Sequence, residues 1–131
     1  MMYTIINKNV IPLKSGNVRH GLRIDDEEFD GFGEIYFSEV KKGCIKGWKR
    51  HSVMVVNLLP VTGDFAVQIK KDFNDKPHKI FFGENDYKLL RIEPNIWFAF
   101  EGLGSKNIIA NVASIPHDPN EAETIEYGEI T

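Results

Sequence analysis

Turn-forming residues divide this chain into short apolar segments, and that spacing limits what it can fold into. The segments rich in Val, Ile, Phe and Tyr lie within residues 11–24, 25–40, 43–61, 63–72, 78–94 and 95–116. Gly, Pro, Asn or Asp separate them about every 8–12 residues, which is typical of β-sandwiches and barrels. A helix that began near Asp25 would be stopped by Gly31 and Gly33. The sequence therefore predicts an all-β protein.

The chain is large enough to bury one hydrophobic core. It has 131 residues, of which 42% are hydrophobic, and no repeat or linker interrupts it. We therefore expect a single domain over residues 1–131. The net charge of -3 and the isoelectric point near 5.8 argue against a nucleic-acid-binding protein, because such domains carry a basic excess.

Location follows from what the sequence lacks. Residues 1–10 have neither the cationic start nor the apolar stretch of a signal peptide. No apolar run approaches the roughly 20 residues that a membrane helix needs. We expect a cytoplasmic protein that contacts no membrane. Cys44 is the one cysteine and cannot form an internal disulfide, and the alternating segment around it predicts a buried side chain.

A local cluster of basic side chains contrasts with the negative net charge. Residues 43–63 read GCIKGWKRHSVMVVNLLPVTG, with Lys46, Lys49, Arg50 and His51 around Trp48. If residues 45–57 form one strand, Lys49, His51 and Asn57 share one face, and Lys46, Trp48 and Arg50 share the other. A strand that is polar at one end and apolar at the other fits a barrel whose mouth binds a ligand. Solvated charges near a strand end are the alternative.

The stretch EIYFSEVKKGCIKGWKRHSVMVVNLLPVTGDFAV resembles the cupin-type sugar-nucleotide epimerases related to dTDP-4-dehydrorhamnose 3,5-epimerase. Four features of that family have counterparts here. Its Ser-bearing strand is matched by Ser38, its Gly turn by Gly43, its Arg-Gly-x-His segment by Lys46 and Gly47, and its later Gly by Gly63. EPNIWFAFEGL and IPHDPNEAE resemble two further family segments. At the place of the family's catalytic His stands Lys49, with His51 two residues on, which indicates a divergent branch. The resemblance implies a cupin double-stranded β-helix and a homodimer that acts in surface polysaccharide biosynthesis, lipopolysaccharide included.

The chemistry that this resemblance implies is an epimerisation or isomerisation next to the carbonyl of a 4-keto-6-deoxy sugar nucleotide. Such a reaction needs a base, a cation at the enolate oxygen and an acid. His51 is the predicted base, because its ordinary pKa lies near neutral pH. Lys49 is the predicted enolate stabiliser or, with a lowered pKa, the base itself. Tyr36 is the predicted acid, since related cupin 3,4-ketoisomerases carry a Tyr on this strand.

Other residues are expected to bind the nucleotide sugar. Lys46 matches the family's phosphate-contacting Arg, and Arg50 is a second candidate for the diphosphate. The remaining expected contacts are Trp48, Trp97, Ser38 and Asn57. The alternative to an enzyme is a non-catalytic cupin that binds a sugar nucleotide as a sensor or as the partner of a pathway enzyme.

No metal or other cofactor is expected. Metal-binding cupins place two His one residue apart, then a Glu, then a distant His. Here Lys49 and Phe98 stand at the first and last of those places, and residues 52–57 contain no Glu. The nucleotide sugar is thus the expected partner, with no nucleic acid and no membrane.

Overall fold

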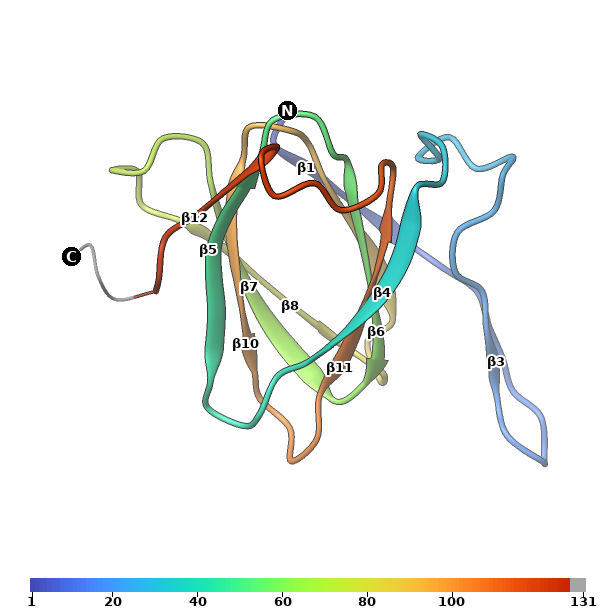
Figure 1. Ribbon diagram of the computed structural model, residues 1–131. Helices are drawn as coiled ribbons and strands as arrows, with labels where there is room; N and C mark the ends of the chain where they lie inside the picture. The colour runs from blue at the N-terminus through green and yellow to red at the C-terminus, as the bar shows by residue number, and fades with distance from the viewer. Residues whose placement is uncertain (128–131) are drawn as a thin grey trace.

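The computed structural model describes residues 1–127, and in that range it contains strands but no helix. One sheet has the strand order β1 (Tyr3–Asn7), β9 (Lys88–Ile92), β6 (Val56–Thr62), β11 (Ile108–Ala113), β4 (Glu34–Glu39). The other has the order β12 (Ala122–Thr124), β5 (Ile45–His51), β10 (Trp97–Gly102), β7 (Asp64–Lys70), β8 (His78–Gly83). The two sheets face each other (Figure 1). The all-β prediction is confirmed, and the topology is that of a cupin jelly roll.

A small hairpin stands apart from these sheets. It pairs β2 (Val10–Ile11) with β3 (Val18–Arg19) and projects from the side of the barrel (Figure 1). The Arg19 guanidinium donates to the carbonyl of Val61, and the Tyr87 hydroxyl donates to the carbonyl of His20. These bonds hold the base of the hairpin against the outer face of the first sheet. No helix within residues 1–127 has the length and apolarity that a membrane crossing requires.

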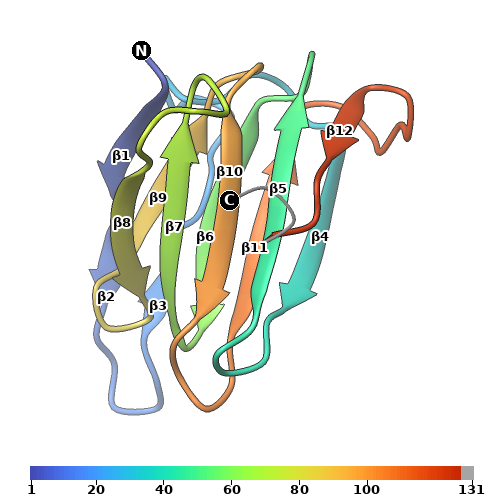
Figure 2. The same cartoon turned by 90° about the vertical axis from the view of Figure 1, so that its left-hand side faces the viewer.

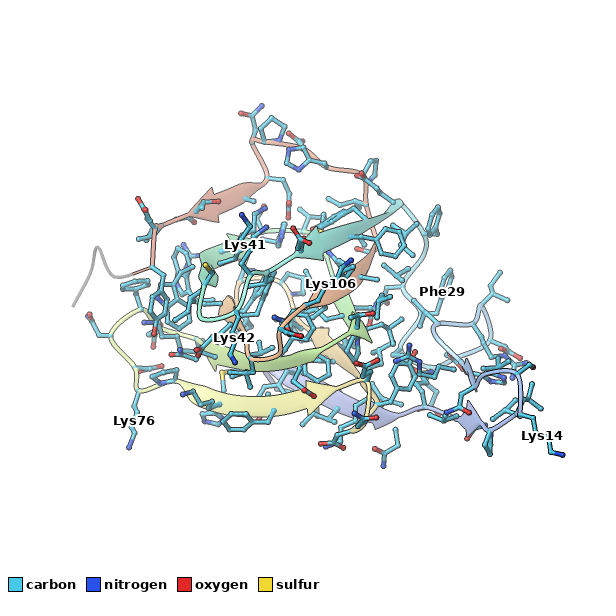
Figure 3. The ribbon with its side chains drawn as sticks, turned by 90° about the horizontal axis from the view of Figure 1, so that it is seen from below. Lys14, Phe29, Lys41, Lys42, Lys76 and Lys106 are labelled. Carbon is cyan, nitrogen blue, oxygen red and sulfur yellow. The ribbon has the colours of Figure 1, made fainter. Side chains whose placement is uncertain are left out.

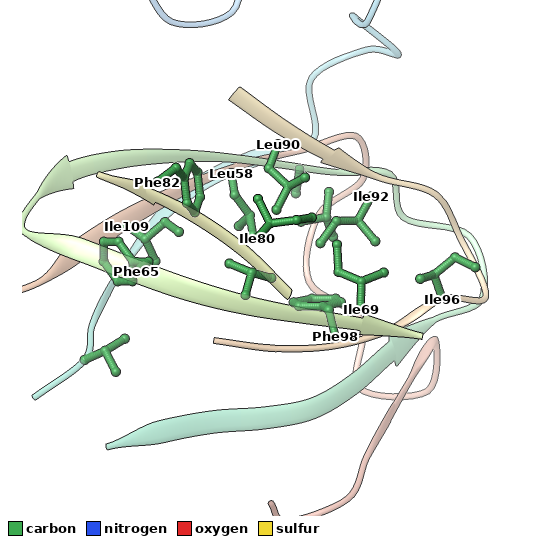
Figure 4. Packing of buried hydrophobic residues seen from close by; sticks show 14 of the residues in the cluster. Leu58, Phe65, Ile69, Ile80, Phe82, Leu90, Ile92, Ile96, Phe98 and Ile109 are labelled. Atoms are coloured by element: carbon green, nitrogen blue, oxygen red, sulfur yellow. The ribbon is translucent and has the colours of Figure 1, made fainter. Parts of the chain in front are cut away.

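The apolar core fills one half of the space between the sheets. Its labelled members in Figure 4 are Leu58, Phe65, Ile69, Ile80, Phe82, Leu90, Ile92, Ile96, Phe98 and Ile109. Most come from β6, β7, β8 and β9, whose alternate side chains point inward as the strand period requires. Each fully buried side chain of this size contributes about 1.5–3 kcal/mol. The other half, between β4 and β11 on one side and β5 and β10 on the other, also contains the inward-pointing polar side chains, such as Tyr36, Lys49 and Asn111.

A bulge in β5 changes which of its side chains point inward. The register with β10 pairs Lys49 with Phe98, Gly47 with Ala99, and Lys46 with Phe100. Gly47 and Trp48 therefore lie opposite the single residue Ala99. At this bulge the alternation of side chains between the two faces of β5 shifts by one residue. Lys46 joins Lys49 and His51 on the inner face, so our prediction of Lys46 on the face opposite Lys49 is wrong.

The predicted single strand over residues 45–57 is also wrong. β5 ends at His51, a turn follows over residues 52–55, and β6 begins at Val56 in the facing sheet. Val56 and Leu58 point into the core, which leaves Asn57 on the outer face. Cys44 was predicted to be buried but is exposed, because it lies in the connection before β5 rather than in a strand.

After β11 the chain crosses from the first sheet to the second over one end of the barrel. We call residues 114–127 the C-terminal strap (Figure 1). Its strand β12 pairs with β5 along the edge that β10 does not occupy, with Ala122 opposite His51, Glu123 opposite Arg50 and Thr124 opposite Lys49. Residues 128–131 lie outside the described part. The strap thus covers the free edge of the strand that carries the basic cluster.

The bulge gives a first prediction. Gly47 has a φ of 132°, and a Cβ placed there would lie 2.7 Å from the Cβ of Ala99. Gly47→Ala should lower the free energy of unfolding by about 1–3 kcal/mol because of backbone strain, and by a further amount because of the clash. Urea unfolding measures the change.

Gly16 provides a matched control. Its φ is 130°, and a Cβ there would meet no atom within 4 Å. Gly16→Ala should therefore show the strain cost alone. Equal destabilisation by the two substitutions would mean that the close approach of β5 to β10 at Gly47 does not affect the free energy of unfolding.

Candidate active site

A cavity of about 240 Å³ opens between the polar halves of the two sheets. Its lining residues are Tyr36, Ser38, Lys46, Gly47, Lys49, Leu58, Phe98, Phe100, Ile109, Asn111 and Thr124. β4 and β11 supply one wall, and β5, β10 and β12 supply the facing wall. The floor and sides are largely apolar, whereas the polar atoms come from a few side chains. Such a lining is typical of a site for a small polar ligand.

His51 lies on the inner face of β5, one strand repeat beyond the cavity-lining Lys49. Its imidazole is 4% exposed and stacks on the Phe98 ring at a centroid distance of 6.2 Å. Its Nδ1 lies 2.7 Å from Oε1 of Glu121, at the start of the paired part of the strap. Its Nε2 is buried and has no hydrogen-bond partner within the described residues.

The electrostatics of this pair define which ring nitrogen is basic. Burial lowers the pKa of His51, against an opposing effect of the Glu121 carboxylate. Burial works to raise the pKa of Glu121, but hydrogen bonds from His51 and from the backbone N–H groups of Met54 and Val53 outweigh it and lower the pKa. A neutral imidazole beside an ionised carboxylate must donate from Nδ1. The lone pair of His51 is therefore on Nε2.

On the facing wall, Asn111 orients Tyr36. The Oδ1 of Asn111 accepts the backbone N–H of Asn57 at 3.0 Å, so its Nδ2 donates to the Tyr36 hydroxyl at 2.8 Å. The phenol oxygen thus already accepts one hydrogen bond, and its own hydrogen remains available to the cavity. Burial raises the pKa of Tyr36, despite the hydrogen bond from Asn111. Tyr36 is a protonated donor at neutral pH.

Two lysines bring positive charge to the cavity. Lys46 and Lys49 both line it, and neither forms a hydrogen bond or an ion pair with any residue of the described range 1–127. No side chain of the described range therefore neutralises their ammonium groups by direct contact. An unpaired cation on a cavity wall attracts an anion more strongly than one in open water, because screening is weaker there.

The structure places the sequence-predicted residues in two groups. Tyr36, Ser38, Lys46 and Lys49 line the cavity, whereas His51 is not part of the lining but stacks on Phe98, which is. Trp48, Arg50 and Trp97 lie instead on the outer face of the second sheet, where the Arg50 guanidinium stands 4.7 Å from the centre of the Trp97 ring. Trp48 and Trp97 belong to an outer aromatic cluster and are 5% and 4% exposed.

These outer positions correct the predicted substrate contacts. Trp48 and Trp97 cannot stack on a sugar in the cavity, because the bulge directs Trp48 outward and alternation in β10 directs Phe98 inward in place of Trp97. Arg50 forms an ion pair with Glu123 on the same outer face. Asn57 is buried on the outer face of the first sheet and contributes only its backbone N–H, to Asn111.

Sequence reasoning missed Glu121, Asn111 and Phe100 as parts of the site. Glu121 stands 70 residues from His51, so no local spacing connects them. The one available signal was the likeness of IPHDPNEAE to a family segment that ends in Glu. Asn111 could be suspected only as a polar residue within an apolar strand.

The described residues offer no ready metal site. Within residues 1–127 no three His, Cys, Asp or Glu side chains are grouped so that they could hold a metal ion. The donors nearest the cavity are His51 and Glu121, which bind each other. That the protein needs no metal stays a prediction.

Comparisons with known proteins place this fold among enzymes that act on nucleotide sugars. No family model and no curated protein sequence matches the chain. Among solved structures, a dTDP-sugar isomerase from Desulfovibrio desulfuricans G20 is 32% identical, with a TM-score of 0.90 over 97% of this chain and 85% of that one.

Two more distant structures share the fold. A variant of the 3,4-ketoisomerase QdtA from Thermoanaerobacterium thermosaccharolyticum, solved with TDP-4-keto-6-deoxyglucose, is 20% identical, with a TM-score of 0.80 over 92% of this chain and 86% of that one. The 3'-monoepimerase ChmJ from Streptomyces bikiniensis, solved with dTDP-quinovose, is 8% identical. Its TM-score is 0.85 over 94% of this chain and 69% of that one.

Buried His51 generates a prediction about pH. Its pKa in the folded protein lies below the ordinary 6.5, so the unfolded chain binds the proton more readily. The stabilisation from the neutral ring is complete above the unfolded pKa and is lost as the pH falls through the lowered folded pKa. The free energy of unfolding in urea should therefore decrease between about pH 7.5 and 5.5, by at most about 1.4 kcal/mol per pH unit from this group.

His51→Gln serves as the control, because it removes this titration and should flatten the slope in the same window. Glu121 also has a lowered pKa, but its contribution is lost only below its ordinary value of 4.5. The two effects are thus separated in pH. If the variant and the wild type lose stability equally between pH 7.5 and 5.5, His51 is not held neutral by burial.

Proposed function

The chain belongs to the family of dTDP-sugar isomerases, and from that premise we propose that it epimerises or isomerises a 4-keto-6-deoxy sugar nucleotide next to its carbonyl. The observation that carries this proposal is the buried His51–Glu121 pair: its imidazole stacks on the cavity-lining Phe98, and its buried Nε2 has no partner within residues 1–127. A C–H bond next to a ketone is acidic, because its electron pair can move into an enolate. The reaction therefore needs a base, an enolate stabiliser and an acid.

His51 is the proposed base. Glu121 fixes the ring by its bond to Nδ1, and burial keeps the ring neutral, which supports a free lone pair on Nε2. Nε2 takes the proton from the carbon beside the carbonyl. The C–H electron pair forms a carbon–carbon double bond, and the carbonyl electron pair moves onto oxygen. The imidazolium that results is stabilised by the Glu121 carboxylate.

Lys49 and Tyr36 complete the proton transfer. The Lys49 ammonium is unpaired within residues 1–127 and faces the cavity, so it is suited to the negative enolate oxygen. Tyr36 lies on the facing wall and holds its proton, because burial raises its pKa. Its hydroxyl returns a proton to carbon as the carbonyl re-forms. The phenolate and the imidazolium are then reset by proton exchange, so no reactant besides the sugar nucleotide is consumed.

Lys46 and Ser38 are the proposed contacts of the diphosphate. Both line the end of the cavity nearest the connection between β4 and β5. Figure 3 labels Lys41 and Lys42 in that connection and Lys106 in the loop between β10 and β11, and these two loops are joined by a bridge between Lys42 and Gly102. Positive charge thus gathers at this end. We place the sugar towards His51 and the nucleotide towards Lys46.

The test is solvent deuterium entering the sugar. Wild-type protein incubated in D2O with dTDP- and UDP-linked 4-keto-6-deoxy sugars should introduce deuterium at carbons beside the carbonyl. His51→Asn, Lys49→Met and Tyr36→Phe should each lower kcat for this exchange by about 100-fold or more, because each removes a proton-transfer group or an enolate contact. Ligand affinity, measured by calorimetry, should change little.

Lys46→Ala is the contrasting variant. It removes a contact made equally in ground state and transition state, so it should raise KM and leave kcat nearly intact. Exchange at the wild-type rate in both His51→Asn and Lys49→Met would refute the catalytic assignment. Tight binding by a wild type that never exchanges deuterium would instead support the non-catalytic cupin.

We further propose that the protein is a homodimer acting in the cytoplasm in surface polysaccharide biosynthesis, lipopolysaccharide included, as the family resemblance implies. Exposed apolar side chains support a protein–protein contact. On the β2–β3 hairpin these are Val10, Ile11, Leu13 and Val18, which are 42%, 42%, 53% and 46% exposed. Apolar side chains that cluster on a projecting hairpin are typical of an interface.

Sedimentation velocity at micromolar concentration should show a dimer. Leu13→Glu should shift the protein towards monomer, because it buries a charge in the proposed contact. Lys14→Gln, next to it on the same hairpin, is exposed and should leave the dimer intact. A wild type that sediments only as a monomer would contradict the proposal.

A further inference from the structure

An aromatic cluster lies on the opposite side of the sheet from the cavity, and the proposed reaction does not use it. Its members are Trp48, Trp97 and Ala99, packed with Ile45, Phe73, Ile125 and Tyr127. The Lys70 ammonium stands 4.1 Å from the centre of the Trp48 ring and 3.9 Å from that of Phe73. Aromatic rings and a buried cation at such distances form a rigid platform.

The end of the C-terminal strap is fastened to this platform. The Tyr127 ring stacks on Trp48 at a centroid distance of 5.6 Å and an interplanar angle of 26°. The Tyr127 hydroxyl accepts a hydrogen bond of 2.9 Å from the Gln68 side chain. Two backbone bonds also join Trp48 and Ile125, each residue donating its N–H to the other's carbonyl.

The start of the paired strap holds the proposed base. Glu121 binds His51 through Oε1, and through Oε2 it accepts the N–H groups of Val53 and Met54, both at 2.9 Å. Its carbonyl accepts the N–H and the hydroxyl of Ser52. Between Glu121 and Tyr127, β12 is bonded only to β5, at whose far edge lies β10 (Figure 2).

We propose that Tyr127 is a positioning residue for the proposed base, acting through the strap: its stack on Trp48 holds β12 against β5 and so keeps Glu121 on His51. This inference rests on the proposed function for its catalytic consequence. The physical reason is that β12 is three residues long, and so short a strand at a sheet edge frays unless its end is tied down. Fraying would withdraw the carboxylate that fixes the ring.

The amides that Glu121 bonds give a direct test. In Tyr127→Ala, hydrogen exchange at Ser52, Val53 and Met54 should become at least about 10-fold faster, because their acceptor moves away. Exchange in β6 and β9 should not change. Tyr127→Phe keeps the ring stack and loses only the Gln68 bond, so it should restore protection. Glu126→Ala is the matched control, since Glu126 is exposed and forms no hydrogen bond or ion pair within residues 1–127.

Kinetics test the catalytic consequence. Tyr127→Ala should lower kcat for deuterium exchange roughly 10-fold or more with KM little changed, since displacement of a catalytic group by about 1 Å is costly. Tyr127→Phe should stay within about 3-fold of wild type. In a Glu121→Gln background, Tyr127→Ala should add little further loss, because both changes act through the same contact.

Two outcomes would overturn the inference. One is unchanged amide exchange at residues 52–54 in Tyr127→Ala. The other is that Tyr127→Ala lowers kcat by the same factor in the Glu121→Gln background as in the wild type. Amide hydrogen exchange does not depend on catalytic turnover, so it can be measured even if the wild type proves inactive. A failure of the proposed function is therefore distinguishable from a failure of this inference.

Discussion

The hydrogen bond between His51 and Glu121 joins the parts of the molecule on which the site depends. A carboxylate buried beside an apolar core is costly unless both oxygens accept hydrogen bonds, and here one oxygen binds the imidazole and the other binds two backbone N–H groups. The same carboxylate thereby fixes the turn between β5 and β6, the edge of β5 and the orientation of the base.

The two sheets divide the chemical work. In the proposed reaction, the sheet containing β5 supplies His51 and two lysines that have no partner within residues 1–127, whereas the facing sheet supplies Tyr36 and its orienting partner Asn111. A sugar ring bound between the two sheets would have the proposed proton acceptor, His51, on one side and the proposed proton donor, Tyr36, on the other. The apolar core occupies the remaining half of the interior and keeps these walls at a fixed separation, as close packing does in protein interiors.

The sequence allowed the all-β class to be predicted, because turn residues and β-branched residues are local signals, whereas the cupin jelly roll was implied by the family resemblance. It also allowed Tyr36, Lys49 and His51 to be selected. It failed where geometry depended on distant contacts. The inward position of Lys46 requires the bulge at Gly47, which is defined by the pairing with Ala99. The role of Glu121 requires a contact across 70 residues of chain, and no periodicity encodes such a contact. The assignment of Asn57 failed because β5 ends at His51.

Catalysis by the proposed route requires that Glu121 holds His51 as a neutral ring with the proton on Nδ1 and the lone pair on Nε2. The most direct measurement is a long-range proton–nitrogen NMR spectrum of the imidazole rings at about pH 7 in labelled protein. We expect His51 to show one protonated nitrogen, Nδ1, and one unprotonated nitrogen, Nε2, and we expect Glu121→Gln to disturb this pattern. A His51 ring protonated on Nε2, or on both nitrogens, in the wild type would contradict it.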